Sequence, residues 1–191
     1  MSDLHPVTDI HPDIDRILIS QEEINARIAE LGAQISADYQ GEELLLVCIL
    51  KGAFVFMADL ARAITVPVQT GFIAVSSYGH STQSSGVVRI MKDLDQSVEG
   101  QNVLIVEDIV DTGLTLAYIA SLLHDRHPKS LKICALTNKP QCRKKEVTID
   151  YCGFVLPNEF VVGYGLDYQD YYRNLPYIGV LKPSRYAQSH G

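Results

Sequence analysis

The sequence predicts an α/β fold, in which a mainly parallel twisted sheet is flanked by helices and a small hood lobe is assembled from the chain ends. Short apolar runs of strand length alternate with segments of helical periodicity, which is the pattern of βαβ units. The 191 residues are 47% hydrophobic and 20% charged, enough for one domain with a buried core. We expect a single domain over residues 1–191, with its core at about 40–140 and its hood from about 1–39 and 141–181.

The first predicted helix spans residues 20–38, and Ser20 and Glu23 have the spacing of a capping box at its start. Apolar residues recur within it at helical intervals: Ile24, Ile28, Leu31 and Ile35. The run at 43–50 is continuously apolar, as is typical of a strand buried on both faces of a parallel sheet. Helical character returns at 53–64.

The remaining core strands are predicted from apolar or alternating runs between polar turns: 68–78, 87–94, 102–106 and 131–137. A polar, Ser- and Gly-rich segment at 79–86 is expected to be a mobile loop. Thr115 is expected to cap the helix that follows the third of these strands. After Pro140 shorter strand-like pieces appear, YCGFVL, FVVGYG and YIGVL, which we place in the hood; the tail KPSRYAQSHG matches no pattern.

Charge and composition exclude several classes of function. The formal charge of −7 and the pI near 5.3 disfavour a main role in binding nucleic-acid phosphates or an acidic membrane surface. The N-terminal stretch MSDLHPVTDIHPDID has neither the basic nor the apolar region of a secretory signal, and no apolar stretch is long enough to cross a bilayer. The four cysteines form no C-x-x-C pair. We expect a cytoplasmic protein that binds neither nucleic acid nor membrane.

The stretch EDIVDTGLT, residues 107–115, follows the buried-strand pattern NVLIV and carries three acids. In parallel α/β sheets ligands bind where strands lead into helices, and the amides and hydroxyls of DTGLT suit a phosphate. Gly113 permits a positive φ or close approach of a ligand. Glu107 and Asp108 would repel that phosphate, so we expect them to meet sugar hydroxyls or a divalent cation. A ribose 5-phosphate fits both halves and would place Asp111 near the reacting carbon.

Other interpretations of this stretch account for it less well. Asp108 and Asp111 are three residues apart, which does not match a D-x-D-x-T phosphatase motif, and no G-x-x-x-x-G-K-[ST] precedes them. A purely structural turn would rarely gather three acids.

The stretch VLIVEDIVDTGLTL resembles the phosphoribosyl-pyrophosphate binding motif of the type I phosphoribosyltransferases, in the version found in the hypoxanthine-guanine phosphoribosyltransferases. The resemblance runs from about Ile17 to Leu181 and implies the family's fold. It also implies the family's reaction: a purine-salvage transfer of the 5-phosphoribosyl group from phosphoribosyl pyrophosphate to hypoxanthine or guanine, giving IMP or GMP and pyrophosphate. The donor would be bound by the whole motif: Glu107, Asp108, Ile109, Val110, Asp111, Thr112, Gly113, Leu114 and Thr115.

The resemblance further implies roles at the reacting end of the donor. Asp111 matches the general base that takes the proton from purine N7, a role typically worth roughly 100- to 10,000-fold in rate. Asp167 in GYGLDY matches a carboxylate that helps to hold magnesium, with Glu107 and Asp108 near the ion and on the ribose hydroxyls. Magnesium needs only one or two protein carboxylates when phosphate oxygens and water complete its shell.

Two further segments match the family's pyrophosphate site. Leu50, Lys51 and Gly52 match its loop, and the resemblance implies a cis peptide bond between Leu50 and Lys51. Arg173 in DYYRNL matches the second pyrophosphate contact, where a planar guanidinium suits phosphate oxygens. The segment that begins at Ser77 and Tyr78 and runs to Gly86 resembles the family's lid, which would keep water from the sugar.

For the purine, Lys139 in TNKP resembles the lysine that donates a hydrogen bond to the 6-oxo group, which would favour 6-oxopurines over adenine. Phe160 matches the aromatic residue that stacks on the base, and Val161 the backbone contact to its edge. Without the resemblance, Phe160 and Val161 read equally well as core strand residues. Asn138 stands where bacterial relatives commonly have an acid.

Two alternatives stay open at the level of sequence: a ligand-sensing, nucleic-acid-binding regulator of the same fold, and a phosphoribosyltransferase that prefers xanthine. The acidic charge disfavours the regulator. So does the joint presence of the residues a catalyst needs: Lys51, Asp111, Lys139, Asp167 and Arg173. The family suggests a homodimer or homotetramer.

Overall fold

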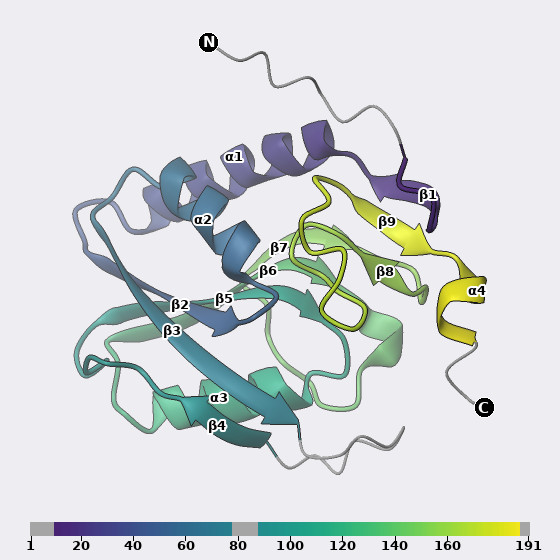
Figure 1. The fold of residues 1–191 in the computed structure, drawn as a ribbon. Coiled ribbons are helices and arrows are strands. Elements are labelled where there is room, and N and C mark those ends of the chain that lie inside the picture. The colour runs from purple at the N-terminus through teal and green to yellow at the C-terminus, as the bar shows by residue number, and fades with distance from the viewer. Residues whose placement is uncertain (1–9, 78–87, 188–191) are drawn as a thin grey trace.

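The computed structural model describes residues 10–77 and 88–187, and its centre is a six-stranded sheet in the order β4-β3-β2-β5-β6-β7 (Figure 1). Four pairs of neighbouring strands run parallel, and β4 joins the edge antiparallel. The mainly parallel sheet predicted from the sequence is confirmed. The strands are β2 (Leu44–Leu50), β3 (Val68–Ser77), β4 (Val88–Lys92), β5 (Asn102–Val110), β6 (Ser130–Asn138) and β7 (Tyr151–Val155).

Helices cover both faces of this sheet. Helices α1 (Gln21–Asp38) and α2 (Phe54–Ala63) lie on one face, and α3 (Leu114–His124) lies on the other (Figure 1). The predicted capping box of α1 is present, since the Ser20 hydroxyl accepts from the Glu23 amide at 3.2 Å and the Glu23 carboxylate accepts from the Ser20 amide at 2.8 Å. Within the described residues, no helix combines the length and apolar character that crossing a membrane requires.

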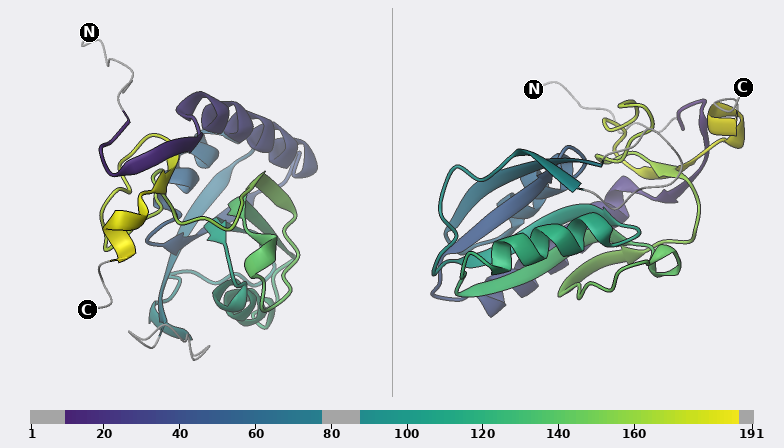
Figure 2. Two further views of the ribbon diagram at one scale, coloured as in Figure 1. Left: turned by 90° about the vertical axis from the view of Figure 1, so that its right-hand side faces the viewer. Right: turned by 90° about the horizontal axis from the view of Figure 1, so that it is seen from below.

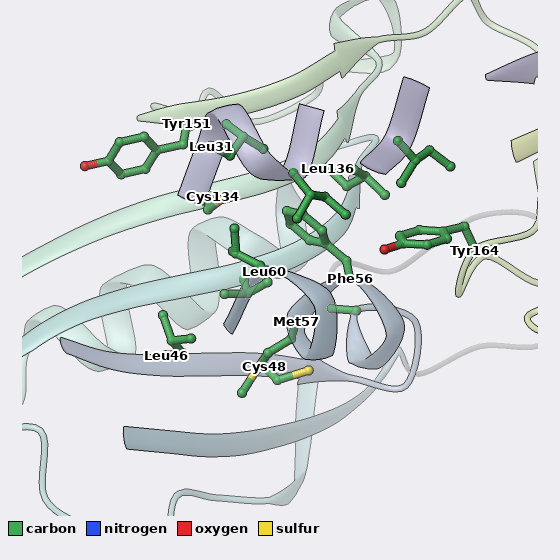
Figure 3. Packing of buried hydrophobic residues seen from close by; sticks show 14 of the residues in the cluster. Leu31, Leu46, Cys48, Phe56, Met57, Leu60, Cys134, Leu136, Tyr151 and Tyr164 are labelled. Carbon is green, nitrogen blue, oxygen red and sulfur yellow. The ribbon is translucent and has the colours of Figure 1, made fainter. Parts of the chain in front are cut away.

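The continuous apolar run of β2 is explained by burial on both faces. Leu46 and Cys48 pack with α1 and α2, whereas Val47 and Ile49 pack with α3. Figure 3 shows the α1–α2 side of this core, where Phe56 and Leu60 of α2 lie among Leu31 of α1, Leu46 of β2 and Leu136 of β6. Full burial of each such side chain contributes about 1.5–3 kcal/mol to folding.

A three-stranded antiparallel sheet, in the order β1-β9-β8, forms the hood from the two chain ends. Its strands are β1 (Ile14–Ile19), β8 (Val161–Val162) and β9 (Ile178–Leu181). Figure 2 shows the hood to one side of the large sheet, with β1 beside the C-terminal strand. β1 was not predicted, because its exposed middle residues give it no continuous apolar or alternating pattern.

The structure differs from the expected hood boundaries in two places. Residues 151–155 were placed in the hood, but β7 pairs parallel with β6 and extends the large sheet. Residues 20–38 also fell in the hood range, whereas α1 packs on α2 and fills the core of the large sheet. The reason is that partner choice depends on backbone pairing and on packing between distant segments, which a local apolar pattern does not specify.

The tail also contains structure that the sequence did not indicate. A short helix, α4 (Pro183–Tyr186), follows β9. Its Tyr186 ring stacks on the Phe160 ring, with 5.0 Å between centroids and 22° between planes. A 3-10 turn, Pro140–Cys142, follows β6.

The order of the strands creates a switch point between β2 and β5. From β2 the chain continues through α2 to β3 on one side, and from β5 it continues through α3 to β6 on the other. Because the two connections leave in opposite directions, a crevice opens beyond the carboxyl ends of β2 and β5. The segments that follow Leu50 and Val110 form its walls.

Candidate active site

A cavity of about 280 Å³ lies at this switch point. Residues from β2, β3, β5 and the start of α3 line it. Nine of the lining residues are predicted donor-binding residues: Leu50, Gly52, Glu107, Ile109, Val110, Asp111, Thr112, Gly113 and Thr115. Three further apolar residues were not predicted and carry no signal that distinguishes them from ordinary core residues: Ile49, Val75 and Leu116.

The loop before α3 presents backbone amides to the cavity. Gly113 is the N-cap of α3 with φ 78°, the left-handed conformation that favours glycine. The expectation that Thr115 caps this helix was wrong, because the helix begins one residue earlier, at Leu114. The Leu114 amide reaches the Thr112 hydroxyl only at a long 3.5 Å. The amides of a first helical turn have no partner within the helix, so this loop is suited to bind an anion.

β5 continues through Glu107 and Asp108 as far as Val110, whereas the sequence placed these two acids after the strand. Asp108 is 7% exposed, and its Oδ1 accepts from the Ile109 amide at 2.8 Å. Glu107 Oε2 is buried without a hydrogen-bond partner among the described residues.

The two adjacent carboxyls perturb one another. Burial, together with the neighbouring Asp108, raises the pKa of Glu107 well above its usual range. Burial also raises the pKa of Asp108, although hydrogen bonds with Glu107 and the Ile109 amide oppose that effect. A pair of adjacent carboxyls, one half-buried and one buried, with an unpartnered oxygen is suited to accept hydrogen bonds from sugar hydroxyls or to meet a cation.

Asp111 lies at the exposed rim of the same cavity. In the 3-10 turn, burial and then the neighbouring Asp111 raise the pKa of the Cys142 thiol. That thiol also donates to Asn158 Oδ1 at 3.2 Å. Exposure to the cavity leaves the Asp111 carboxylate available to accept a proton from a bound molecule.

The pyrophosphate loop predicted from the resemblance borders this cavity. The Leu50–Lys51 peptide bond is cis, as expected. A Cβ on Gly52 would lie 1.8 Å from Asp108 Oδ2, and a Cβ on Gly165 would lie 2.2 Å from the Gly52 carbonyl oxygen. The backbone after β2 is therefore packed between Asp108 of β5 and the segment after β8, at distances that only glycine permits.

Next to this loop lies a cluster of charged side chains. Arg173 donates to the Gly165 carbonyl at 2.7 Å and lies 2.8 Å from Asp167 Oδ1. Lys51 lies 3.0 Å from both oxygens of Asp170, a residue that the sequence reading missed. The structure thus brings Lys51 close to Asp167 and Arg173 through Asp170, although more than 100 residues separate the lysine from the others.

The residues predicted to bind the purine lie in two places: Lys139 directly follows β6, and Phe160 and Val161 stand where β8 begins. Lys139 is buried; its amide donates to the Val110 carbonyl at 2.9 Å and its Nζ to the Glu159 carbonyl at 2.6 Å. Phe160 is 40% exposed, while Val161 is buried in β8. One face of Phe160 is occupied by Tyr186.

The residues fit a weakly held magnesium ion better than a preformed metal site. Among the described residues, no three His, Cys, Asp or Glu side chains converge as a metal-binding group. The buried, unpartnered Oε2 of the half-buried Glu107 is a ligand of the type that magnesium prefers. Both oxygens of Asp167 are engaged, one by Arg173 and one by the Asp170 amide. An ion at this site would need further oxygens from a bound phosphate.

Ser77 is the last residue of β3, and its backbone pairs with Val88 of β4. Tyr78 and the remainder of the predicted lid to Gly86 lie outside the described residues.

The crevice lies at the switch point of an α/β sheet and is lined by a strand that carries acidic residues and by an anion-binding loop, which is the arrangement of a phosphoribosyl transferase domain. The family model of that description matches residues 18–169. The hypoxanthine-guanine phosphoribosyltransferase of Mycobacterium avium is 54% identical over 187 residues, which cover 94% of this chain and 92% of the relative. That of Bacillus subtilis strain 168 is 54% identical over 174 residues, 91% of this chain and 97% of the relative. A crystal structure of a hypoxanthine phosphoribosyltransferase from Staphylococcus aureus has a TM-score of 0.91 at 48% identity, covering 95% and 99% of the two chains. The chain belongs to the hypoxanthine-guanine phosphoribosyltransferase family.

Proposed function

We propose that this chain transfers the 5-phosphoribosyl group from phosphoribosyl pyrophosphate to hypoxanthine or guanine, giving IMP or GMP and pyrophosphate. The observation that carries the proposal is the cavity between β2 and β5, which combines an anion-binding helix start with adjacent carboxyls, one oxygen of which, Glu107 Oε2, lacks a hydrogen-bond partner among the described residues. Those two features are complementary to the phosphate and the diol of a ribose 5-phosphate.

The donor is held by its two charged ends. Its 5-phosphate accepts hydrogen bonds from the amides and hydroxyls of residues 111–115 at the start of α3. Its ribose hydroxyls donate to Glu107 and Asp108. Its pyrophosphate lies against Lys51 and Arg173, whose positive charges stabilise the negative charge that builds up on the leaving group.

Magnesium bound by the donor's oxygens and by Asp167, with Glu107 and Asp108 nearby, would supply additional positive charge to the pyrophosphate. The chain's own contribution there is to orient the carboxylates. Arg173 does this for Asp167, since the two groups are 2.8 Å apart.

The acceptor base lies between Asp111 and the hood. Lys139 donates to its 6-oxo group, which requires the Lys139 ammonium to turn from the Glu159 carbonyl toward the base. Phe160 stacks on the ring, Val161 contacts its edge through the backbone, and Asp111 takes the N7 proton as the new bond forms. Lid residues Ser77 and Tyr78 exclude water from the sugar in this proposal.

The two alternatives raised from the sequence find no support in the comparisons. Every relative and structure compared above is described as a phosphoribosyltransferase of hypoxanthine or of hypoxanthine and guanine. The net charge of −7 argues against nucleic acid as a partner. We further propose a cytoplasmic homodimer or homotetramer; the four free cysteines of the chain accord with a reducing compartment.

A direct assay tests the proposal. The protein is incubated with magnesium, phosphoribosyl pyrophosphate and one of four bases (hypoxanthine, guanine, xanthine or adenine), and the nucleotide formed is identified by chromatography and mass spectrometry. We expect IMP and GMP at higher rates than the xanthine and adenine products. The absence of product from every 6-oxopurine, with folded protein, would refute the proposal.

A further inference from the structure

Asp170 bridges the two cations that are proposed to bind pyrophosphate. Lys51 Nζ donates to both carboxylate oxygens of Asp170 at 3.0 Å, and Arg173 Nη2 donates to Asp170 Oδ1 at 2.9 Å. The Asp170 carboxylate thereby joins Lys51, directly after β2, to Arg173 in the segment between β8 and β9 (residues 163–177, here called the hood segment). Its two oxygens accept from the same nitrogens that a phosphate group would engage.

The turn that carries Asp170 holds this carboxylate in place. Gln169, Asp170 and Tyr172 all have a positive φ, at 54°, 66° and 75°. Residues with a side chain adopt this conformation at a cost, and asparagine and aspartate tolerate it best. The Asp170 amide donates to Asp167 Oδ2 at 2.8 Å, and the backbones of Tyr168 and Tyr171 bond to each other in both directions. The backbone position of Asp170 is therefore set by the turn, which places its exposed side chain beside the two cations.

The cluster has no net charge in this state. Lys51 and Arg173 contribute two positive charges, and Asp167 and Asp170 contribute two negative charges. Asp167 is the proposed magnesium ligand, so it has a use when the donor is bound. Asp170 has no such use, and a pyrophosphate at Lys51 and Arg173 would meet its negative charge at close range.

We propose that Asp170 is an internal counter-ion that occupies Lys51 and Arg173 in the absence of pyrophosphate and competes with pyrophosphate for them. The proposal rests on the roles of Lys51 and Arg173 given above. The Lys51 and Asp170 side chains are 68% and 63% exposed, and ion pairs this exposed are weak enough for a multiply charged ligand to displace them. After transfer, the Asp170 carboxylate pairs again with Lys51 and Arg173, which assists the departure of pyrophosphate.

The test is the affinity for inorganic pyrophosphate with magnesium, measured by isothermal titration calorimetry on the full-length protein. We expect Asp170→Asn to bind pyrophosphate about three- to tenfold more tightly, since one or two exposed ion pairs no longer compete. Asparagine tolerates the positive φ, so the turn is kept. The affinity for GMP should change by less than about twofold, because its phosphate occupies the α3 site instead. In steady-state assays, the inhibition constant of pyrophosphate should fall by the same factor as its dissociation constant.

Asp125→Asn is the matched control, since it removes the same charge from an exposed carboxylate at the far end of α3. It should leave pyrophosphate affinity unchanged. If Asp170→Asn binds pyrophosphate equally well or more weakly, Asp170 does not compete with the ligand and the proposal is wrong.

Lys51→Gln separates this proposal from the function on which it rests. We expect Lys51→Gln to weaken pyrophosphate binding, and we expect the gain from Asp170→Asn to be smaller when both changes are combined. An unchanged affinity in Lys51→Gln would instead show that the pyrophosphate assignment of Lys51 is itself wrong. Weakened binding in Lys51→Gln without a gain in Asp170→Asn would overturn only the role of Asp170.

Discussion

Gly52 and Asp108 are in contact so close that a Cβ on Gly52 would lie 1.8 Å from Asp108 Oδ2. The contact joins the loop after β2, which carries Lys51, to the adjacent carboxyls of Glu107 and Asp108 in β5. On its other side the Gly52 carbonyl faces Gly165 of the hood segment, where an added Cβ would come within 2.2 Å. The three parts of the proposed donor site are thereby held together by close packing of the Gly52 backbone against the Asp108 side chain on one side and the Gly165 backbone on the other.

We expect Gly52→Ala to fold but to lose most of its activity. The added methyl group must displace Asp108 or the loop, and overpacking of this kind costs about 1–3 kcal/mol of stability. A shift of about 1 Å in catalytic groups can lower kcat/KM by about 100-fold. Circular dichroism, denaturant unfolding and steady-state kinetics provide the measurements. Gly100→Asn serves as a control, because nothing lies within 4 Å of the missing Cβ of Gly100 and asparagine tolerates its positive φ. Full activity in Gly52→Ala would contradict the tight coupling described here.

Asp111→Asn should separate chemistry from donor binding. Asparagine keeps the size of the side chain but cannot accept the N7 proton, so kcat should fall by about 100- to 10,000-fold. The donor's dissociation constant should change little, because the amides of the α3 start and the pyrophosphate cations remain. Stopped-flow or rapid-quench measurement of the transfer step, with donor binding measured separately, checks both parts. A variant as fast as the native protein would remove Asp111 as the base.

Lys139→Met should reduce the preference for 6-oxopurines. Methionine fills the volume of this buried side chain without the donor, and the loss of a hydrogen bond from a charged group should lower kcat/KM for hypoxanthine by about 10- to 100-fold. Activity with adenine should fall much less, so the ratio between the two bases should narrow. Lys144→Met, in the exposed segment nearby, should keep the native ratio. An unchanged ratio in Lys139→Met would show that another group reads the 6-position.

Glu107→Gln should lower the activity of the protein but raise its folding stability at neutral pH. The pKa of Glu107 is raised in the folded state by burial and by Asp108, whereas the pKa of a glutamate in the unfolded chain is about 4.3. Between these two pKa values the folded state binds more protons than the unfolded state, so this residue makes the native protein less stable as pH rises. Because glutamine does not titrate, the variant does not lose this stability as pH rises.

The difference in unfolding free energy between Glu107→Gln and the native protein should therefore be near zero below pH 4. It should grow in favour of the variant as pH rises to 7–8, because the pKa of Glu107 is raised in the folded state. Denaturant unfolding at a series of pH values, without ligand or magnesium, measures it. Glu99→Gln, at an exposed position, should show no such trend. If the difference in unfolding free energy instead grew as pH fell, the pKa of Glu107 would not be raised in the folded state.

Much of the local structure could be predicted because its causes are local. The capping box of α1 depends on two residues three positions apart, and both of its hydrogen bonds are present. The run at 43–50 is apolar because both faces of β2 are buried, and that requirement is visible in any parallel core strand. The anion loop is equally local, since Gly113 and its neighbours supply the amides themselves.

The errors have a common origin in contacts between distant segments. β1 was missed because it gains its partner from β9, more than 150 residues away. β7 was placed in the hood because nothing in YCGFV indicates which sheet edge it will extend. Thr115 was a reasonable cap by residue type, but the N-cap is Gly113, where an added Cβ would lie 2.3 Å from the Lys145 carbonyl oxygen of a segment distant in the chain.

By itself the sequence determined the class of protein and the chemistry of its central motif, because helix capping, strand burial and an amide-rich turn all arise from residues close together in the chain. Only the tertiary structure decided how Lys51, Asp167 and Arg173 share one site and that Asp170 lies between the two cations. Those distances depend on β2 lying beside β5 and on the hood segment folding back over both. Such an arrangement results from the packing of the whole core, to which no short stretch of residues corresponds.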